Sequence, residues 1–197
     1  MSSRKILVLN GHPGQTSLSK SLCQAYMDAA WEKGHTIRNH DLGEMSFDPD
    51  YGEGGYANPK PLEPDLEAFV SDLEWADHIV MSTPLWWGAV PAKLKGLIDR
   101  SLLPGRSFDT RNPNRFGIPG PLHTGKTARV LLTSDTPSAL LGLFYGNAIK
   151  KTLSRQVLGF VGIKPTKFAT FAPATHAPDS KVKTWLSQVA SLGAKAA

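Results

Sequence analysis

Short apolar runs alternate with segments of helical periodicity along most of this chain, and this alternation is what most restricts its fold. The apolar runs, which we expect to be strands, lie at residues 5–10, 36–41, 78–83, 127–133 and 167–171. Apolar residues at helical spacing predict helices over about 17–33, 65–75, 91–102, 138–160 and 180–192. Because parallel strands need crossover connections, the pattern predicts one α/β domain over residues 1–197, with a parallel sheet covered by helices on both faces.

The composition of the runs also predicts the order of the strands. Residues 6–9, 79–81 and 130–132 are apolar without alternation, as expected for central strands buried on both faces. Residues 36–41 alternate more and are predicted to form an edge strand. This assignment favours the strand order 2-1-3-4-5, in which ligands bind beyond the ends of the first and third strands.

Composition and charge exclude several classes of protein. No segment approaches the roughly 18 uninterrupted apolar residues of a membrane helix, and residues 6–9 are too few for a signal-peptide core, so we expect a cytoplasmic protein without membrane insertion. The net charge of +5 is spread along the chain, which disfavours nucleic acid and suits small anions. Cys23 is the only cysteine, so a disulfide and a thiolate metal cluster within the chain are excluded and no metal site is predicted. Its apolar neighbours at helical spacing predict a buried thiol.

The segment after the first predicted strand, Asn10-Gly11-His12-Pro13-Gly14-Gln15-Thr16-Ser17-Leu18-Ser19, is rich in hydrogen-bond donors. Its hydroxyls, its histidine and the start of the following helix together favour a phosphate group. Ser17 taken alone also fits an ordinary helix N-cap. Neither a P-loop nor a Gly-x-Gly-x-x-Gly pattern is present, which disfavours nucleoside triphosphates and a Rossmann site.

The second unusual loop follows the third predicted strand and reads Pro84-Leu85-Trp86-Trp87-Gly88. Two large aromatic residues at the carboxyl end of a strand indicate a flat ligand, and Pro91 fits the first position of the next helix. The alternative is that Trp86 and Trp87 only plug the end of the core.

Further motifs accompany these loops: Asp41-Leu42, Phe47-Asp48-Pro49, and the block from Pro84 through Ala92-Lys93-Leu94-Lys95-Gly96 to Gly105-Arg106-Ser107-Phe108. With Gly11-His12-Pro13 and Ser17-Leu18-Ser19, they resemble the flavodoxin-like NAD(P)H:quinone oxidoreductase family over nearly the whole chain. The resemblance implies a flavodoxin-like three-layer sandwich. It also implies a flavin, FMN or alternatively FAD, with NADH or NADPH as co-substrate and a quinone-like acceptor in a ping-pong cycle of hydride transfer. Relatives of this kind form homodimers.

The resemblance also assigns residues to the flavin. The phosphate is expected at His12, Ser17, Leu18 and Ser19. The isoalloxazine ring is expected over Pro84, Leu85, Trp86, Trp87 and Gly88, where backbone N–H groups can stabilise its reduced form.

Two positions depart from the family pattern. At the end of the fourth predicted strand relatives typically carry Thr-Thr-Gly-Gly, whereas this chain has Ser134-Asp135 in place of the two glycines and continues with Thr136-Pro137. Thr133 and Asp135 are expected near the flavin, although Asp135 also fits the N-cap of a helix near residue 138. Tyr145 stands where mammalian relatives have a substrate-polarising histidine, and it is the one candidate catalytic residue, as a hydrogen-bond donor to a quinone oxygen. An alternative function is a flavin-binding regulatory or electron-carrier protein, such as an ancillary subunit of a potassium efflux system.

Two long segments, 44–64 and 103–125, are rich in proline and glycine and are expected to be irregular. Tyr51 and Tyr56 give the first one apolar anchors. Arg111 or Arg115 in the second suits the 2′-phosphate of NADPH, although a solvated arginine is the commoner outcome.

Overall fold

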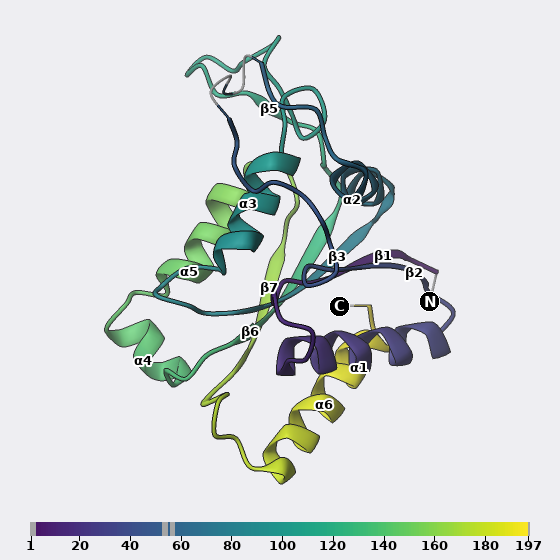
Figure 1. Ribbon diagram of the computed structural model, residues 1–197, viewed down its shortest axis with the longest axis vertical. Coiled ribbons are helices and arrows are strands. Elements are labelled where there is room, and N and C mark those ends of the chain that lie inside the picture. The colour runs from purple at the N-terminus through teal and green to yellow at the C-terminus, as the bar shows by residue number, and fades with distance from the viewer. Residues whose placement is uncertain (1–2, 53–54, 56–57, 197) are drawn as a thin grey trace.

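A five-stranded parallel sheet forms the centre of the computed structural model, which describes residues 3–52, 55 and 58–196 (Figure 1). The strand order is β2-β1-β3-β6-β7, which confirms the predicted order 2-1-3-4-5 and the edge position of the second predicted strand. The strands are β1 (Lys5–Asn10), β2 (Thr36–Asp41), β3 (His78–Pro84), β6 (Thr127–Thr133) and β7 (Thr166–Phe171). Each lies within one residue of its predicted bounds.

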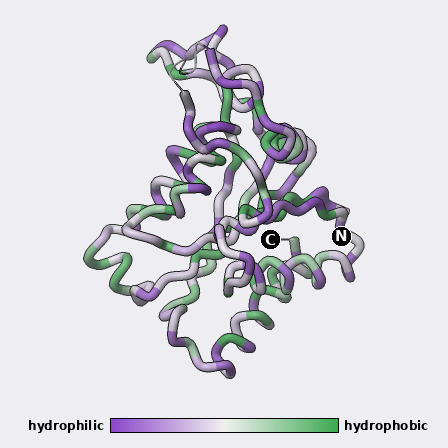
Figure 2. The backbone as a smooth tube through the Cα atoms, in the orientation of Figure 1, coloured by the Kyte–Doolittle hydropathy of each residue, from purple (hydrophilic) through white to green (hydrophobic). Residues whose placement is uncertain are grey.

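Helices cover both faces of this sheet, because successive side chains of a strand point to opposite faces and both sets are apolar in the central strands. On one face, Ile6 and Val8 pack with α1 (Leu18–Glu32) and α6 (Asp179–Gly193). On the other face, Leu7 and Leu9 pack with α2 (Pro64–Trp75) and α3 (Ala92–Ser101). Figure 2 shows hydrophobic and hydrophilic residues interspersed along the helices, as expected for helices with one buried side.

Residues 138–160 do not form the single predicted helix, and that prediction was wrong. The segment divides into α4 (Ser138–Leu143), α5 (Ala148–Lys151) and the π-helix η2 (Thr152–Val157). Gly146 and Asn147 have φ of +56° and +54°, so the backbone is left-handed at two successive residues and the helix cannot continue through them. The break exposes an apolar turn, where Leu143 and Phe144 are 76% and 71% exposed.

The first long loop is held to the core by a buried arginine. Arg100 of α3 is 2% exposed, and its guanidinium donates to the carbonyl oxygens of Asp48 (2.6 Å) and Pro61 (2.8 Å) and to Glu63 Oε2 (2.9 Å). Because one planar guanidinium bonds all three partners, it holds Asp48 next to Pro61 and Glu63 and so brings the two ends of the loop together. Tyr51 is half-buried, and Tyr56 lies outside the described residues.

The second long loop contains a short hairpin that the sequence did not predict, formed by β4 (Phe108–Asp109) and β5 (Gly120–Pro121). Between these strands Arg111 pairs with Asp109 (2.8 Å), and the guanidinium of Arg115 lies 4.7 Å from the ring centroid of Phe116. Both arginines therefore have partners within their own loop.

Cys23 is buried as predicted, and burial raises the pKa of its thiol to about 12. No helix among the described residues is long and apolar enough to cross a membrane.

Candidate functional site

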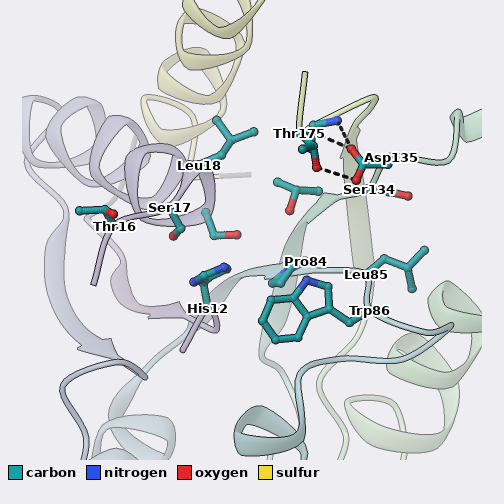
Figure 3. A pocket seen from close by; sticks show the side chains of 13 residues that line it. His12, Thr16, Ser17, Leu18, Pro84, Leu85, Trp86, Ser134, Asp135 and Thr175 are labelled. Atoms are coloured by element: carbon teal, nitrogen blue, oxygen red, sulfur yellow. Dashed lines mark hydrogen bonds between the residues drawn. The ribbon is translucent and has the colours of Figure 1, made fainter. Parts of the chain in front are cut away.

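The loops that follow β1, β3, β6 and β7 meet at the carboxyl edge of the sheet, beside the first turn of α1 (Figure 3). They enclose a cleft of about 290 Å³, which we call the anion cleft. Its lining residues are His12, Thr16, Ser17, Leu18, Ser19, Pro84, Leu85, Trp86, Thr133, Ser134, Asp135, Ala174 and Thr175. The two loops singled out in the sequence therefore lie opposite each other, as the strand order requires.

The first turn of α1 forms one wall of the anion cleft. Ser17 is its N-cap, and its Oγ accepts the backbone N–H of Lys20 at 3.1 Å. The N–H groups of Leu18 and Ser19 belong to the first turn, where no carbonyl of the same helix is available to accept them. The hydroxyl of Ser19, in a residue only 1% exposed, has no hydrogen-bond partner among the described residues. Buried hydroxyls normally have a partner, so this wall is built to receive an acceptor.

His12 lies across the cleft from this turn. Its Nδ1 accepts the backbone N–H of Gly14 at 3.0 Å, so in the neutral ring the proton is on Nε2. The ring is perpendicular to the indole of Trp86, with an interplanar angle of 79° and 5.5 Å between centroids. The histidine therefore adds a ring N–H donor to the cleft.

The two tryptophans form a tight β-turn. Trp86 and Ala89 exchange two backbone hydrogen bonds of 2.9 Å, and the intervening Trp87 and Gly88 have φ of +49° and +78°. Positive φ at both central residues is the geometry of a type I′ turn, which favours Asn-Gly and is strained for a bulky residue. Trp87 is fully exposed, so it does not plug the core, and for this residue the alternative was wrong.

The helix after this turn begins one residue later than predicted. Pro91 occupies the N-cap and not the first helical position, because its ψ of 145° is extended, and α3 starts at Ala92.

A second cleft, of about 490 Å³, lies beside the first and shares Leu85, Ser134 and Asp135 with it. We call it the acceptor cleft, after the quinone-like acceptor that the sequence led us to expect. Its remaining lining residues are Trp87, Gly88, Thr136, Leu141, Tyr145, Asn147, Ala148 and Ile149. The left-handed turn at Gly146 and Asn147 turns the chain so that Tyr145 borders this cleft, where it is 64% exposed. The predicted site residues thus divide between two adjoining clefts.

Asp135 connects two loops and does not cap a helix. Its Oδ1 accepts the backbone N–H groups of Ala174 (3.1 Å) and Thr175 (2.7 Å), and its Oδ2 accepts the Thr175 hydroxyl (2.6 Å). Pro137 occupies the N-cap of α4, so the capping alternative was wrong. The hydrogen bonds from Thr175 hold the pKa of the Asp135 carboxyl below its ordinary value. A negative charge therefore lies where the two clefts join.

Thr133 is buried at the end of β6, where its carbonyl accepts the N–H of Leu85 at 2.8 Å and aligns the tryptophan loop. Sequence reasoning missed Ala174 and Thr175. The one available signal was their place just after the fifth strand, because the carboxyl ends of all parallel strands meet at one edge.

The family model for the flavodoxin-like fold matches residues 4–192. The chain belongs to the flavodoxin-like fold family. Its sheet order and the ligand-sized cleft at the carboxyl edge agree with that assignment.

Three relatives illustrate the similarity. The FMN-dependent NADH:quinone oxidoreductase of Cereibacter sphaeroides strain KD131 is 30% identical over 190 residues, which are 95% of this chain and 86% of that protein. The ribosyldihydronicotinamide dehydrogenase-like protein traD of Penicillium crustosum is 31% identical over 153 residues, which are 66% of this chain and 57% of that protein. The chain thus spans little more than half the length of this fungal relative. The structure of an NAD(P)H:quinone oxidoreductase from Methanothermobacter marburgensis superposes with a TM-score of 0.79 at 24% identity, covering 98% of each chain, and shows the same fold.

Proposed function

We propose that this protein is a flavin-dependent NAD(P)H:quinone oxidoreductase and that its flavin is FMN. The observation that carries the proposal is the buried hydroxyl of Ser19 in the first turn of α1, which has no partner among the described residues and belongs to a residue that lines one cleft together with His12 and Trp86. Flavin mononucleotide combines an anionic phosphate with a flat ring. The first turn of α1 suits the phosphate, and the side of the cleft at Trp86 suits the ring. The name of the Cereibacter relative, which includes FMN and a quinone, supports the same choice. FAD is the alternative.

The residues of the anion cleft fit a phosphate. The ring N–H of His12, the hydroxyls of Ser17 and Ser19 and the free N–H groups at Leu18 and Ser19 all donate, and the helix dipole adds a positive partial charge. Several hydrogen-bond donors that point into one cleft and have no acceptor within the protein form a preorganised binding site for an anion.

The isoalloxazine ring is assigned to Pro84, Leu85, Trp86, Trp87 and Gly88, next to Thr133 and Asp135. A bound flavin would supply the hydride transfer between NAD(P)H and the acceptor, which these side chains cannot perform themselves. Trp86 would exclude water from one side of the ring, and the backbone N–H groups of Trp87 and Gly88, which take no part in the paired bonds of the turn, would be available to the ring.

NAD(P)H and the quinone-like acceptor occupy the acceptor cleft in turn, which makes the kinetics ping-pong. The Tyr145 hydroxyl donates a hydrogen bond to the acceptor oxygen and stabilises the negative charge that develops there. The cleft is mostly apolar, with Leu85, Leu141 and Ile149 among its lining residues, as suits a flat aromatic molecule.

A second copy of the chain is proposed to cover the apolar turn beside this cleft. Leu143 and Phe144 are 76% and 71% exposed there, and exposed apolar surface of this kind marks an interface. A homodimer buries the same patch on both copies.

The test compares Ser19→Ala with Ser21→Ala, which removes an exposed hydroxyl from the same turn of α1. The flavin released from the purified protein is identified by mass, and the flavin-free chain is titrated with FMN and FAD. We expect FMN to bind, Ser19→Ala to weaken it about tenfold through one lost charge-assisted hydrogen bond, and Ser21→Ala to leave it unchanged.

Oxidation of NADH and NADPH is then followed with menadione as acceptor. Turnover with parallel double-reciprocal lines supports a ping-pong enzyme, whereas a flavin-loaded protein without turnover supports the regulatory or carrier alternative. A chain that binds neither flavin contradicts both.

A further inference from the structure

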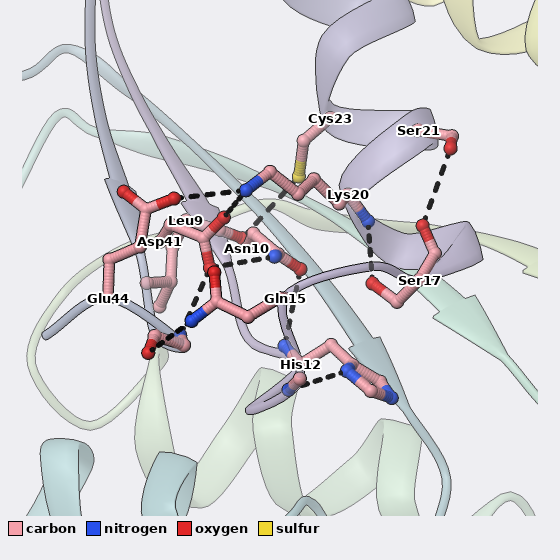
Figure 4. Close-up of polar contacts among 12 residues, drawn as sticks. Leu9, Asn10, His12, Gln15, Ser17, Lys20, Ser21, Cys23, Asp41 and Glu44 are labelled. Atoms are coloured by element: carbon pink, nitrogen blue, oxygen red, sulfur yellow. Dashed lines mark hydrogen bonds and ion pairs between the residues drawn. The ribbon is translucent and has the colours of Figure 1, made fainter.

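A polar network lies next to His12 and Ser17, two lining residues of the anion cleft (Figure 4). Asn10, at the end of β1, is the neighbour of Asp41 in the register of β2, and its Nδ2 donates to Asp41 Oδ1 at 3.0 Å. Asp41 Oδ2 lies 2.7 Å from the ammonium of Lys20 on α1. Asn10 is 4% exposed and the Asp41 side chain 10%, whereas the side chain of Lys20 is 41% exposed. Three elements thus meet at one carboxylate.

Asp41 determines which way the amide of Asn10 faces. An ionised carboxylate only accepts hydrogen bonds, so the NH₂ group of Asn10 must face it. Asn10 Oδ1 is then turned towards the next loop, where it accepts the backbone N–H of His12 at 3.2 Å. Hydrogen bonds from Lys20 to Asp41 and Glu44 raise the pKa of Lys20, so the ammonium stays charged beside the carboxylate.

The backbone bond to His12 is followed by a bond to its ring. The turn from His12 to Gly14 directs the N–H of Gly14 at Nδ1 of the imidazole (3.0 Å), which fixes Nδ1 as an acceptor and leaves the proton on Nε2. If the amide of Asn10 were reversed, its NH₂ group would face the N–H of His12, and two donors would open the turn.

We propose that Asp41 is a positioning residue that, through Asn10, holds His12 as an Nε2–H donor facing the anion cleft. The inference rests on the proposed function only for the identity of the anion, the phosphate of FMN. The position of the ring proton itself is a property of the flavin-free chain.

The test reads that proton directly. Flavin-free protein labelled with ¹³C and ¹⁵N in histidine is examined by NMR, because the imidazole shifts distinguish the Nε2–H from the Nδ1–H tautomer. We expect the Nε2–H form in the wild type and a mixture in Asp41→Ala, with FMN binding weakened about tenfold for one lost charge-assisted bond. Asn10→Leu, which keeps Asp41 and its pair with Lys20, is expected to give the same mixture, and it serves if Asp41→Ala does not fold.

The matched control is Lys20→Met, which removes the ion pair to Asp41 but leaves the bond from Asn10. It is expected to keep the Nε2–H tautomer. The proposal is overturned if Asp41→Ala or Asn10→Leu keeps the wild-type tautomer, or if Lys20→Met loses it as fully as Asp41→Ala does. If the tautomer shifts as expected but FMN does not bind the wild type, the proposed cofactor is wrong and the positioning role of Asp41 stands.

Discussion

Replacing Trp87 by asparagine is expected to stabilise the protein while weakening its ligand site. Trp87 occupies the first central position of a type I′ turn with φ of +49°, a conformation that costs an L-residue about 1–2 kcal/mol. Asparagine is favoured at this position, and the fully exposed indole has no burial to lose within one chain. We therefore expect the free energy of unfolding to rise by about 1 kcal/mol and Tm to rise by about 2–4 °C for a chain of this size. Asparagine is preferred to glycine because glycine would also increase the entropy of the unfolded chain.

The assay is thermal and urea unfolding of flavin-free protein, diluted until Tm no longer depends on concentration, so that any dimer is dissociated. Trp87→Val is the opposite perturbation and should lower Tm, since β-branched residues tolerate positive φ poorly. Trp31→Asn is the matched control, because Trp31 is also exposed but lies in the regular helix α1 and should give no gain. A loss of stability in Trp87→Asn at high dilution would falsify the strain argument. The same variant should bind FMN or the acceptor more weakly than the wild type.

Three other predictions concern stability. Lys126→Met leaves three carbonyl oxygens near the end of α2 without the ammonium that now lies 2.6–2.7 Å from each, and should cost about 1–3 kcal/mol in urea unfolding. The control is Lys95→Met, which removes an exposed ammonium and should cost less than about 0.5 kcal/mol. Equal losses of stability in the two variants would show that the bonds of Lys126 to the three carbonyl oxygens do not stabilise the fold. Burial lowers the pKa of His123 to about 4, so the unfolded chain alone binds this proton between about pH 6.5 and 4, and stability should fall as the pH drops through that window, by up to about 1.4 kcal/mol per unit. The pH dependence of the unfolding free energy should become weaker in His123→Asn, and an unchanged dependence would contradict its assignment to His123. Arg100→Met should release the chain at Asp48 and at Pro61 to Glu63 and raise the rate of proteolytic cleavage there in the folded protein, whereas an unchanged rate would mean that other contacts hold these residues.

The sheet was predictable because its central strands are apolar on both faces, so Ile6 and Leu7 identify a strand whichever face each one meets. Ser17 was recognisable both as the N-cap of α1 and as a lining residue of the anion cleft, because α1 begins at the carboxyl edge of the sheet. The break in residues 138–160 was not predictable from spacing. Apolar residues such as Leu141, Ile149 and Leu153 continue at nearly helical intervals across it, and periodicity carries no information about the sign of φ at Asn147.

The partner of Asp135 was also beyond the sequence. The carboxylate fits an N-cap locally, and only the neighbouring β6 and β7 bring Thr175, forty residues away, within 2.6 Å of it. Asp135 therefore makes the tertiary hydrogen bonds to Thr175 in place of the local helix N-cap that its residue type favours.

The three hydrogen bonds between Asp135 and the loop at Ala174 and Thr175 also bear on how molecules reach the clefts. They join two loops into one stiff wall, and opening it would expose an ionised carboxylate that has lost all three donors. The opposite rim, at Trp87 and Tyr145, is exposed and has no comparable brace among the hydrogen bonds of the described residues. We therefore expect the substrates of the proposed ping-pong cycle to enter and leave the clefts from one side. In the proposed cycle we expect the dinucleotide to leave and the acceptor to arrive past the tryptophan turn, so that the motion of that turn, more than of the Asp135 wall, sets the rate of exchange.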